Sequence, residues 1–293
     1  MNGVLLINKP KDMTSHDVVY SLRKKLQIKK IGHAGTLDPM AEGVLVMLIG
    51  QGTKLSDYLL SKSKTYLAEF ELGYETDTLD STGEVVSSGG NTEYSRDEIQ
   101  KVFESLSGDI LQVPPIYSAI KVKGKKLYDY ARSGEAVDIQ SRHVTIYDLN
   151  MVCDAPLTLQ TTVSSGTYIR SLIRDIGHAL GTYATMTGLV RQASGTFTLD
   201  HALSLESISD MTISDIEKAL IPMDQALGFE PVVVPDHLYK RITNGLMYFH
   251  EGFEADVYYN VYCRNTYIGI GKYSHYHGQW GLKIVKNLLG VNA

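Results

Sequence analysis

The sequence predicts an α+β protein of two domains, a larger one over residues 1–228 and a smaller, β-rich one over residues 229–293. The chain has 293 residues, enough for one large domain plus a small one. In the first part, segments with strand patterns are interspersed with segments of helical spacing. Beyond Phe229, short tyrosine-rich strand patterns follow one another closely, which is typical of a small barrel.

Composition and segment lengths exclude several classes of protein. With 43% hydrophobic residues, the chain has the composition of an ordinary globular protein. No apolar run reaches the roughly 20 residues of a membrane span, and the first ten residues lack the features of a signal peptide. We therefore expect a cytoplasmic protein without a membrane partner. Cys153 and Cys263 belong to no CxxC or Cys/His cluster, so we expect neither a metal site nor a disulfide and interpret both side chains as buried.

The formal net charge of −5 is distributed unevenly. Residues 61–100 contain 3 basic and 9 acidic residues, and residues 201–229 contain 1 and 5, which leaves the rest of the chain at +5. Each basic cluster is either a solvated face or a surface that neutralises phosphates, and charge alone does not distinguish the two. The clusters are Arg23, Lys24, Lys25, Lys29 and Lys30, and then Lys121, Lys123, Lys125 and Lys126.

The N-terminal segment predicts a strand followed by a helix. Gly3–Asn8 is almost wholly apolar and is typical of a buried strand that ends at Lys9-Pro10, because Pro10 cannot donate a ladder hydrogen bond. From the residues alone, Lys9 is simply the end of this strand. Thr14 and Ser15 are candidate N-caps for a helix whose apolar stripe consists of Val18, Val19, Leu22 and Leu26.

A glycine-rich loop over residues 32–43 precedes an apolar strand at Val44–Ile49. Three glycines and a proline in this loop predict a tightly turning backbone. Pro39 restricts the preceding Asp38 to extended conformations, so the carboxylate is held in a defined direction. Asp-Pro is also a common turn dipeptide. Asp38 is therefore either an ordinary turn residue or an acid presented for chemistry.

The next segments predict a short helix and a half-buried strand. The helix is expected over Thr53–Leu60. Lys64–Leu72 has alternating apolar residues, which predict a strand with Tyr66 on its buried face. This pattern alone makes Tyr66 a core or strand-end aromatic residue.

An acidic segment and a capped helix follow. Gly73–Gly83 contains several carboxylates but lacks the spacing of a calcium-binding loop, so we expect a solvated turn. Ser95-Arg96-Asp97-Glu98 is a capping box for a helix that ends near Gly108.

Cations and tyrosines are interleaved over Pro114–Lys121 and Lys126–Gly134. Cations neutralise phosphates and aromatic rings stack on bases, so this composition is expected of an RNA-contacting surface. A strand is then expected over Leu157–Val163, and helical spacing begins at Thr167 and ends at Gly181.

Arg170 occupies the first turn of that helix, where the helix dipole favours anions over cations. A nearby carboxylate would account for this position. The alternative is a surface arginine that is tolerated at a modest cost.

The last segments complete the two predicted domains. We expect a strand over Ala193–Phe197 after Leu189, and helices within residues 201–228. In the C-terminal part we expect strands at Val232–Val234, Val257–Cys263, Thr266–Gly271 and Trp280–Val285, and a short helix near Pro235–Leu246.

Three strings, in this order, resemble motifs of the TruB family of bacterial tRNA pseudouridine-55 synthases. They are Gly-His-x-Gly-x-Leu-Asp-Pro-x-Ala-x-Gly-Val-Leu at 32–45, Pro-Pro-x-Tyr-Ser-Ala-x-Lys with Gly-Lys-x-Leu-Tyr-x-Tyr-Ala-Arg at 114–132, and Gly-Thr-Tyr-Ile-Arg-Ser-Leu at 166–172. The resemblance implies a pseudouridine synthase fold, in which a mixed, largely antiparallel sheet surrounds a central cleft. It also implies a small C-terminal PUA-type RNA-binding domain.

The same resemblance implies roles for individual residues. Asp38 would be the catalytic acid, and Arg170 would pair with it and keep it ionised. Tyr66 would stack on the target base, which must leave its RNA stack to reach an acid. The other substrate-binding residues implied are His33, which would fill the space left in the RNA loop, Tyr168 and Leu189 in the pocket wall, Lys9 beside the site, and Lys121 and Lys123 on the RNA surface.

The implied reaction converts uridine to pseudouridine in the T-loop of tRNA, at position 55, and requires no cofactor or metal. We expect a monomer that acts without a guide RNA. An RNA-binding or RNA-folding protein without catalysis is the alternative, although binding alone would not require Asp38, Tyr66 and Arg170 together. A glycosidase is a third interpretation, but it needs two carboxylates and only one acid has a motif around it.

Overall fold

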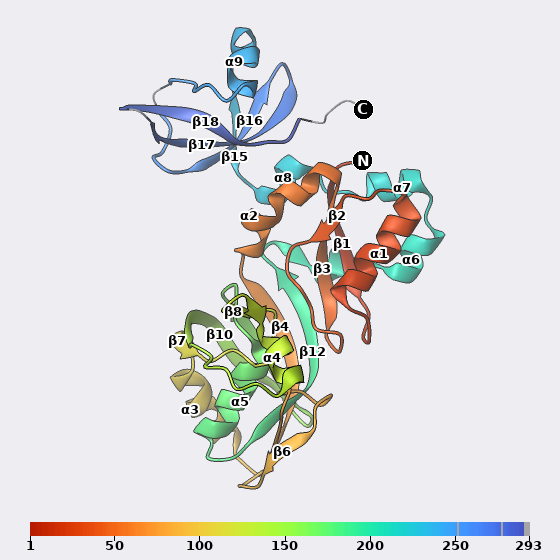
Figure 1. The fold of residues 1–293 in the computed structure, drawn as a ribbon, viewed down its shortest axis with the longest axis vertical. Helices are drawn as coiled ribbons and strands as arrows, with labels where there is room; N and C mark the ends of the chain where they lie inside the picture. The colour runs from red at the N-terminus through yellow and green to blue at the C-terminus, as the bar shows by residue number, and fades with distance from the viewer. Residues whose placement is uncertain (251, 277, 290–293) are drawn as a thin grey trace.

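The computed structural model describes residues 1–250, 252–276 and 278–289. A large mixed sheet with helices on its outside forms most of the molecule, and a smaller β-rich unit lies at one end (Figure 1). The predicted α+β fold is therefore confirmed.

In the described part of the chain, ten strands form the large sheet. Eight follow the order β14-β1-β3-β12-β4-β11-β10-β7, while β2 pairs with β3 and β13 with β12. Its β1–β14 and β3–β12 pairs are parallel and its other pairs antiparallel, as expected. The strands are β1 (Gly3–Lys9), β2 (Ile31–His33), β3 (Glu42–Ile49), β4 (Lys64–Leu72), β7 (Gly108–Gln112), β10 (Arg142–Asp154), β11 (Leu157–Val163), β12 (Ala184–Ser194), β13 (Phe197–Thr198) and β14 (Leu203–Ser204).

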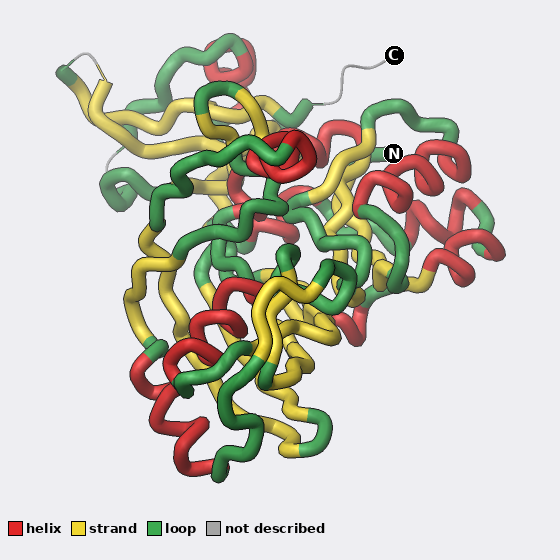
Figure 2. The backbone as a smooth tube through the Cα atoms, turned by 60° about the horizontal axis from the view of Figure 1, so that its bottom comes forward, coloured by secondary structure: helices red, strands yellow, loops and turns green. Residues whose placement is uncertain are grey.

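Helices cover the sheet with their apolar sides. The predicted N-cap Thr14 begins α1 and the predicted capping box at Ser95 begins α3; Thr14 also forms a capping box, with Asp17. Figure 2 shows one group of helices beside the N-terminus and another at the far end of the molecule. The helices are α1 (Ser15–Leu26), α2 (Ser56–Leu60), α3 (Arg96–Ser105), α4 (Leu127–Ser133), α5 (Ile169–Ala179), α6 (Leu205–Asp210), α7 (Ile213–Lys218), α8 (Met223–Leu227) and α9 (Tyr239–Thr243). None of these described helices has the length and apolar character needed to cross a membrane.

Strand β12 joins the two halves of the sheet, because it pairs with β3 on one side and with β4 on the other. Its Arg191 lies opposite Gly43 of β3 and opposite Tyr66 of β4. Burial along β4 alternates as its sequence predicts, and Tyr66 lies on the buried face. The ladder hydrogen bonds of β12 therefore fix β3 and β4 relative to each other.

The prediction of one strand over Ala193–Phe197 is wrong. β12 already ends at Ser194, and the chain returns at once as β13, with Ser194 paired to Phe197. The reversal depends on Gly195, whose φ of +59° is a turn conformation that glycine adopts without strain. The segment is therefore a hairpin.

Three further predictions differ from the structure. The helix expected over Thr53–Leu60 is a 3₁₀ helix over Gly50–Leu55 followed by α2. The acidic segment is not a solvated turn, since Asp80 is only 4% exposed; part of the segment pairs as β5 (Tyr74–Thr76) with β6 (Val85–Ser88). Cys153 is exposed because β10 is uncovered over its last residues, whereas Cys263 is buried as predicted.

The C-terminal residues form the β-rich unit that the sequence predicts. Its strands pair in the order β15 (Glu230–Val233), β16 (Tyr258–Cys263), β17 (Thr266–Tyr276) and β18 (Gln279–Asn287). Where the sequence predicts a small barrel, the described residues form this four-stranded sheet. Where it predicts a helix near Pro235–Leu246, the structure has a 3₁₀ turn followed by the shorter α9. The Asn260 amide donates to the Asp224 and Phe229 carbonyls at 2.8 and 3.0 Å, which attaches this sheet to the preceding residues.

Replacement of Gly43 by alanine is expected to destabilise the protein severely. A Cβ there would lie 2.3 Å from the carbonyl oxygen of Arg191, and the φ of Gly43 is +105°. We expect Gly43→Ala to lower the free energy of unfolding by about 3 kcal/mol or more, measured by urea unfolding. Gly108→Ala is the control, since its φ is +86° but nothing lies within 4 Å. Equal losses in both variants would contradict the predicted clash.

Candidate active site

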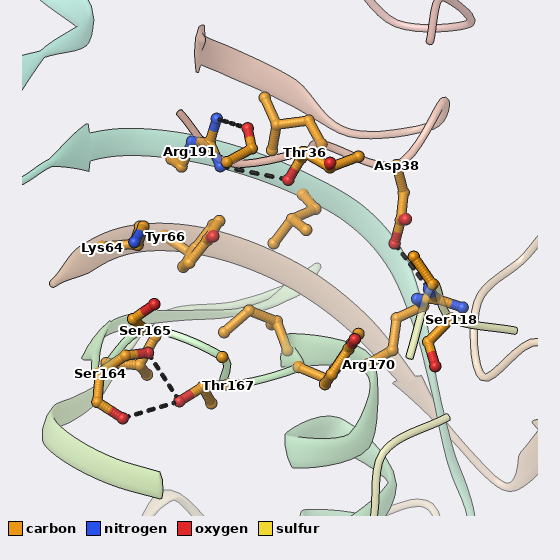
Figure 3. A pocket seen from close by; sticks show the side chains of 18 of the residues that line it. Thr36, Asp38, Lys64, Tyr66, Ser118, Ser164, Ser165, Thr167, Arg170 and Arg191 are labelled. Carbon is orange, nitrogen blue, oxygen red and sulfur yellow. Dashed lines mark hydrogen bonds and ion pairs between the residues drawn. The ribbon is translucent and has the colours of Figure 1, made fainter. Parts of the chain in front are cut away.

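A cavity of about 370 Å³ opens where the glycine-rich loop faces β4 and the start of α5. Five segments that are distant in the sequence supply its walls (Figure 3). The lining residues are Gly35, Thr36, Leu37, Asp38, Leu60, Lys64, Tyr66, Tyr117, Ser118, Ala119, Val163, Ser164, Ser165, Gly166, Thr167, Tyr168, Ile169, Arg170, Leu189 and Arg191.

The ion pair between Asp38 and Arg170 is the strongest electrostatic contact in this cavity. An Nη2 of Arg170 lies 2.8 Å from Oδ2 of Asp38, and the arginine side chain is 6% exposed while that of Asp38 is 39% exposed. The carboxylate thus keeps an accessible side toward the cavity, and its partner does not. The ion pair therefore fixes the direction of the Asp38 carboxylate.

Asp80 provides a second carboxylate for the same guanidinium. Its Oδ2 lies 3.5 Å from Nη1 of Arg170, and both side chains are buried. The arginine also donates to the carbonyls of Thr78 at 2.8 Å and Tyr117 at 3.1 Å. These partners offset the cost of burying the arginine charge.

The Asp38 loop is supported from behind by α1 and β1. The hydroxyl of Ser15 donates to the carbonyl of Leu37 at 3.1 Å and accepts from its N–H at 2.9 Å. Lys9 is fully buried, and its Nζ donates to the carbonyls of Pro10, Met13 and Pro39. Lys9 therefore holds the loop, which differs from the substrate-contacting role that the sequence implied.

Arg191 holds the other side of the loop. Its Nε donates to the Val44 carbonyl at 2.8 Å, and its Nη atoms donate to the carbonyls of Gly35 at 3.1 Å and Thr36 at 3.4 Å. It is 1% exposed, and backbone carbonyls supply these contacts in place of a carboxylate. Charged hydrogen bonds of this kind fix the loop geometry.

Two buried lysines near the loop have lowered basicity. Burial lowers the pKa of Lys9 to about 8 and that of Lys64 to about 8, and Arg191 adds to both effects. The ammonium group of Lys64 donates to the carbonyls of Leu60 and Lys62, which favours its charged form. A pKa of about 8 still leaves Lys64 mostly protonated at neutral pH. Lys64 and Arg191 therefore make the cavity wall opposite the Asp38–Arg170 pair cationic.

The remaining predicted pocket residues form the apolar and aromatic walls. Tyr66 and Leu189 lie on neighbouring strands β4 and β12 and are each 9% exposed. Tyr168 is the N-cap residue of α5, and the side-chain amide of Gln112 clamps both its N–H and its carbonyl. Burial raises the pKa of Tyr168, so its phenol remains protonated.

The structure thus brings together Asp38, Arg170, Tyr66, Tyr168 and Leu189 around one cavity. His33, Lys9, Lys121 and Lys123 do not line it. His33 is half-buried in β2, and its burial together with Arg191 and His16 lowers its pKa, which favours the neutral ring. Among the described residues, no group of three or more His, Cys, Asp or Glu side chains is placed to hold a metal ion.

Lys121 and Lys123 lie on a hairpin just beyond the cavity residues Ser118 and Ala119. Strand β8 (Lys121–Val122) pairs with β9 (Lys125–Lys126) around a two-residue turn. Both turn residues have positive φ, +51° at Lys123 and +85° at Gly124, as in a type I′ turn. This turn leaves Lys121 and Lys123 exposed at the tip.

The sequence did not identify Asp80, Arg191 or Lys64 as site residues. Asp80 was hidden in a segment with several acids, and no local spacing pairs it with Arg170, 90 positions away. The signal for Arg191 was a cation inside an otherwise buried strand pattern. Such a residue requires hydrogen-bond partners when it is buried, and these partners come from the distant loop.

Family models cover most of the chain. The model described as TruB family pseudouridylate synthase, N-terminal domain, matches residues 23–169, and the model described as tRNA pseudouridylate synthase B C-terminal domain matches residues 170–228.

Curated relatives span almost the same length. A tRNA pseudouridine synthase B of Clostridium kluyveri is 43% identical over 92% of this chain and 95% of its own length. That of Bacillus subtilis is 43% identical over 84% and 83%, and that of Clostridium tetani 37% identical over 99% and 100%. The chain is thus a pseudouridine synthase, an isomerase. Within that class it belongs to the TruB family.

Solved structures match the fold. A crystal structure of a Cbf5-Nop10-Gar1 complex gives a TM-score of 0.73 at 25% identity, over 98% of this chain and 85% of the other. The structure of an H/ACA RNP bound to a substrate RNA containing 2'-deoxyuridine gives 0.72 at 23% identity, over 99% and 86%. The sheet of this chain is therefore that of pseudouridine synthases of the Cbf5 and TruB type.

Replacement of Arg170 by lysine is expected to impair turnover. Lysine keeps the charge, but its single nitrogen cannot occupy the two separate positions of Nη1, which donates to the Thr78 carbonyl, and Nη2, which contacts Asp38 and the Tyr117 carbonyl. We expect kcat to fall about 100-fold through loss of carboxylate orientation, with RNA affinity unchanged. Steady-state kinetics and filter binding measure the two effects.

Arg174→Lys is the matched control, because Arg174 lies on the same helix, pairs with Asp175 and does not line the cavity. Comparable kcat losses in both variants would contradict a specific role for Arg170.

Proposed function

We propose that this chain converts uridine to pseudouridine in the T-loop of tRNA, at position 55, with Asp38 as nucleophile or base. The observation that carries the proposal is the 2.8 Å ion pair between Asp38 and a buried Arg170, at a cavity with a tyrosine wall. Relatives of this length and similarity are named tRNA pseudouridine synthase B, which supports tRNA as the substrate.

The proposed reaction moves the base without net oxidation or reduction. The bond between N1 of uracil and C1′ of ribose breaks, and a bond between C5 and C1′ forms. C5 loses its proton to solvent and N1 gains one. Asp38 can add to C6, attack C1′, or remove a proton from the ribose to give a glycal, and each route requires an ionised carboxylate. We assign to the guanidinium of Arg170 the orientation of that carboxylate in all three routes.

The cavity can also hold a base that has left the base stack of the RNA. An enzyme that modifies a base in a folded loop usually extrudes the nucleotide into a pocket. Tyr66 is placed to stack on the uracil, with Leu189 and Tyr168 as neighbouring walls. We propose that the neutral ring of His33 fills the space that the extruded base leaves in the RNA loop.

Regions outside the cavity have proposed roles in RNA binding. We assign catalysis to residues 1–228 and PUA-like RNA binding to residues 229–293. The exposed lysines of the β8–β9 hairpin, Lys121 and Lys123, would contact phosphates. We further propose a monomer that acts in the cytoplasm without a guide RNA.

Replacement of Asp38 by asparagine is expected to abolish the reaction. The amide is close in size to the carboxylate but carries no charge, so folding and RNA binding should remain. We expect tritium release from a [5-³H]uridine-labelled tRNA transcript to fall by at least about 10⁴-fold, the scale of losing an essential catalytic group. The measurement compares wild type and Asp38→Asn, with RNA affinity determined for both.

Two outcomes would contradict the proposal. Tight tRNA binding by wild type without tritium release would favour an RNA-binding protein or another RNA substrate. Release by Asp38→Asn at a rate near that of wild type would remove Asp38 from the chemistry.

Replacement of Lys123 by alanine is expected to weaken RNA binding with little effect on kcat. Loss of one phosphate contact should reduce the slope of log affinity against log salt by about 0.7 to 0.9. Lys218→Ala is the control, since Lys218 is also exposed and lies on α7, far from the hairpin in Figure 1. Unchanged salt slopes for Lys123→Ala would exclude a phosphate contact there.

A further inference from the structure

Three lysines lie at the junction between the large sheet with its helices and the C-terminal sheet. They are Lys30 of the first basic cluster, Lys54 of the 3₁₀ helix before α2, and Lys286 of β18, and we call them the junction lysines. The carbonyl of Lys30 accepts from the N–H of Gly50 at 2.8 Å, which places Lys30 beside the helix of Lys54. None of the three lines the cavity, so the proposed reaction does not account for them.

The junction is packed, which holds lysines of both units in place. Leu59 of α2 belongs to the same hydrophobic cluster as Ile270 and Leu288 of the C-terminal unit. The ring of Tyr58 packs edge-on against that of Tyr258, with 5.3 Å between the centroids. Figure 1 shows α2 next to the C-terminal sheet. Residues on the two sides of this contact therefore keep a defined separation.

Two of the junction lysines reach across from one unit to the other. The ammonium group of Lys54 donates to the Asn287 carbonyl at 2.7 Å, and that of Lys286 lies 3.4 Å from Oδ2 of Asp57. Asp57 is 79% exposed, and an ion pair with such an exposed partner contributes little to stability. The side chain of Lys30 is exposed at the same junction.

The positive charges of the junction lysines are close enough to repel one another. Burial lowers the pKa of Lys54, and the charges of Lys30 and Lys286 lower it further. Over residues 1–250, 252–276 and 278–289, neither Lys30 nor Lys54 has a carboxylate within 4.0 Å. Like charges held together destabilise a fold, and a bound anion would relieve that repulsion.

We propose that the junction lysines form an RNA-binding surface for phosphates of the tRNA outside the nucleotide in the cavity, so that both units hold the same RNA. This inference rests on the proposed function and adds a surface that joins its catalytic and RNA-binding parts. An RNA backbone carries regularly repeated negative charges, and lysines neutralise them without reading sequence.

The surface lies within reach of RNA that occupies the cavity. Leu60 lines the cavity and follows Lys54 by six residues, which is about 10 Å along a helical chain. An RNA whose target nucleotide enters the cavity can therefore extend to the junction.

The test uses the double variant Lys30→Gln/Lys286→Gln, which removes two charges and leaves the Lys54 hydrogen bond in place. Filter binding of a tRNA transcript at several salt concentrations gives Kd and its salt slope. We expect Kd to rise about tenfold and the slope of log affinity against log salt to fall by about 1.4 to 1.8. The value of kcat/KM for tritium release should fall by a similar factor. The Tm should be unchanged or higher, because repulsion is removed.

Two further variants separate RNA binding from a structural role. Lys101→Gln is the matched control, because Lys101 is exposed on α3, far from the C-terminal sheet in Figure 1, and it should keep the wild-type Kd and salt slope. Asp57→Asn breaks the same ion pair as the loss of Lys286 but removes a negative charge. It should therefore raise tRNA affinity about twofold.

Three results would overturn the proposal. They are an unchanged salt slope in the double variant, a loss of Tm that parallels its loss of affinity, and a loss of affinity in Asp57→Asn like that of the double variant. Absence of tritium release by wild type would instead overturn the proposed reaction, and the tRNA affinities would still decide this inference. Wild-type release together with a double variant of wild-type affinity would overturn the inference alone.

Discussion

The burial of one arginine charge constrains much of this structure. Arg170 lies near the start of α5 with its side chain 6% exposed, and a guanidinium in such a place is costly without nearby acceptors. Its acceptors come from three separate segments, the Asp38 loop, the acidic segment with Asp80, and the chain at Tyr117. Each of these segments has to approach the same point. Two of these segments, the Asp38 loop and the chain at Tyr117, also line the cavity.

The loop that carries Asp38 is held by cations that use backbone carbonyls as acceptors. Lys9 and Arg191 both donate to carbonyls close to Asp38 in the sequence, and within 4.0 Å neither is paired with an acid among the described residues. These carbonyl acceptors therefore fix the loop on which Asp38 lies.

Sequence patterns predicted the parts of the fold that depend on local physics. Short windows of sequence were enough to predict the alternation in β4, the N-cap of α1, the capping box of α3 and the unusual cation at Arg170. Motif resemblance supplied Asp38 and Tyr66. The roles of Asp80 and Arg191 could not be predicted, because they depend on partners that only the folded chain brings into contact.

The double pairing of β12 divides the cavity into a stiff side and an adjustable side. Arg191 is in register with Gly43 at the end of the Asp38 loop and with Tyr66 on the opposite strand, so the spacing between acid and ring is a property of the ladder. Changing that spacing requires breaking strand hydrogen bonds. The segments around Ser118 and Ser164 belong to loops outside the ladder. The loop side can therefore adapt to a differently shaped nucleotide, during binding or in evolution, without breaking the hydrogen bonds of the strand ladder.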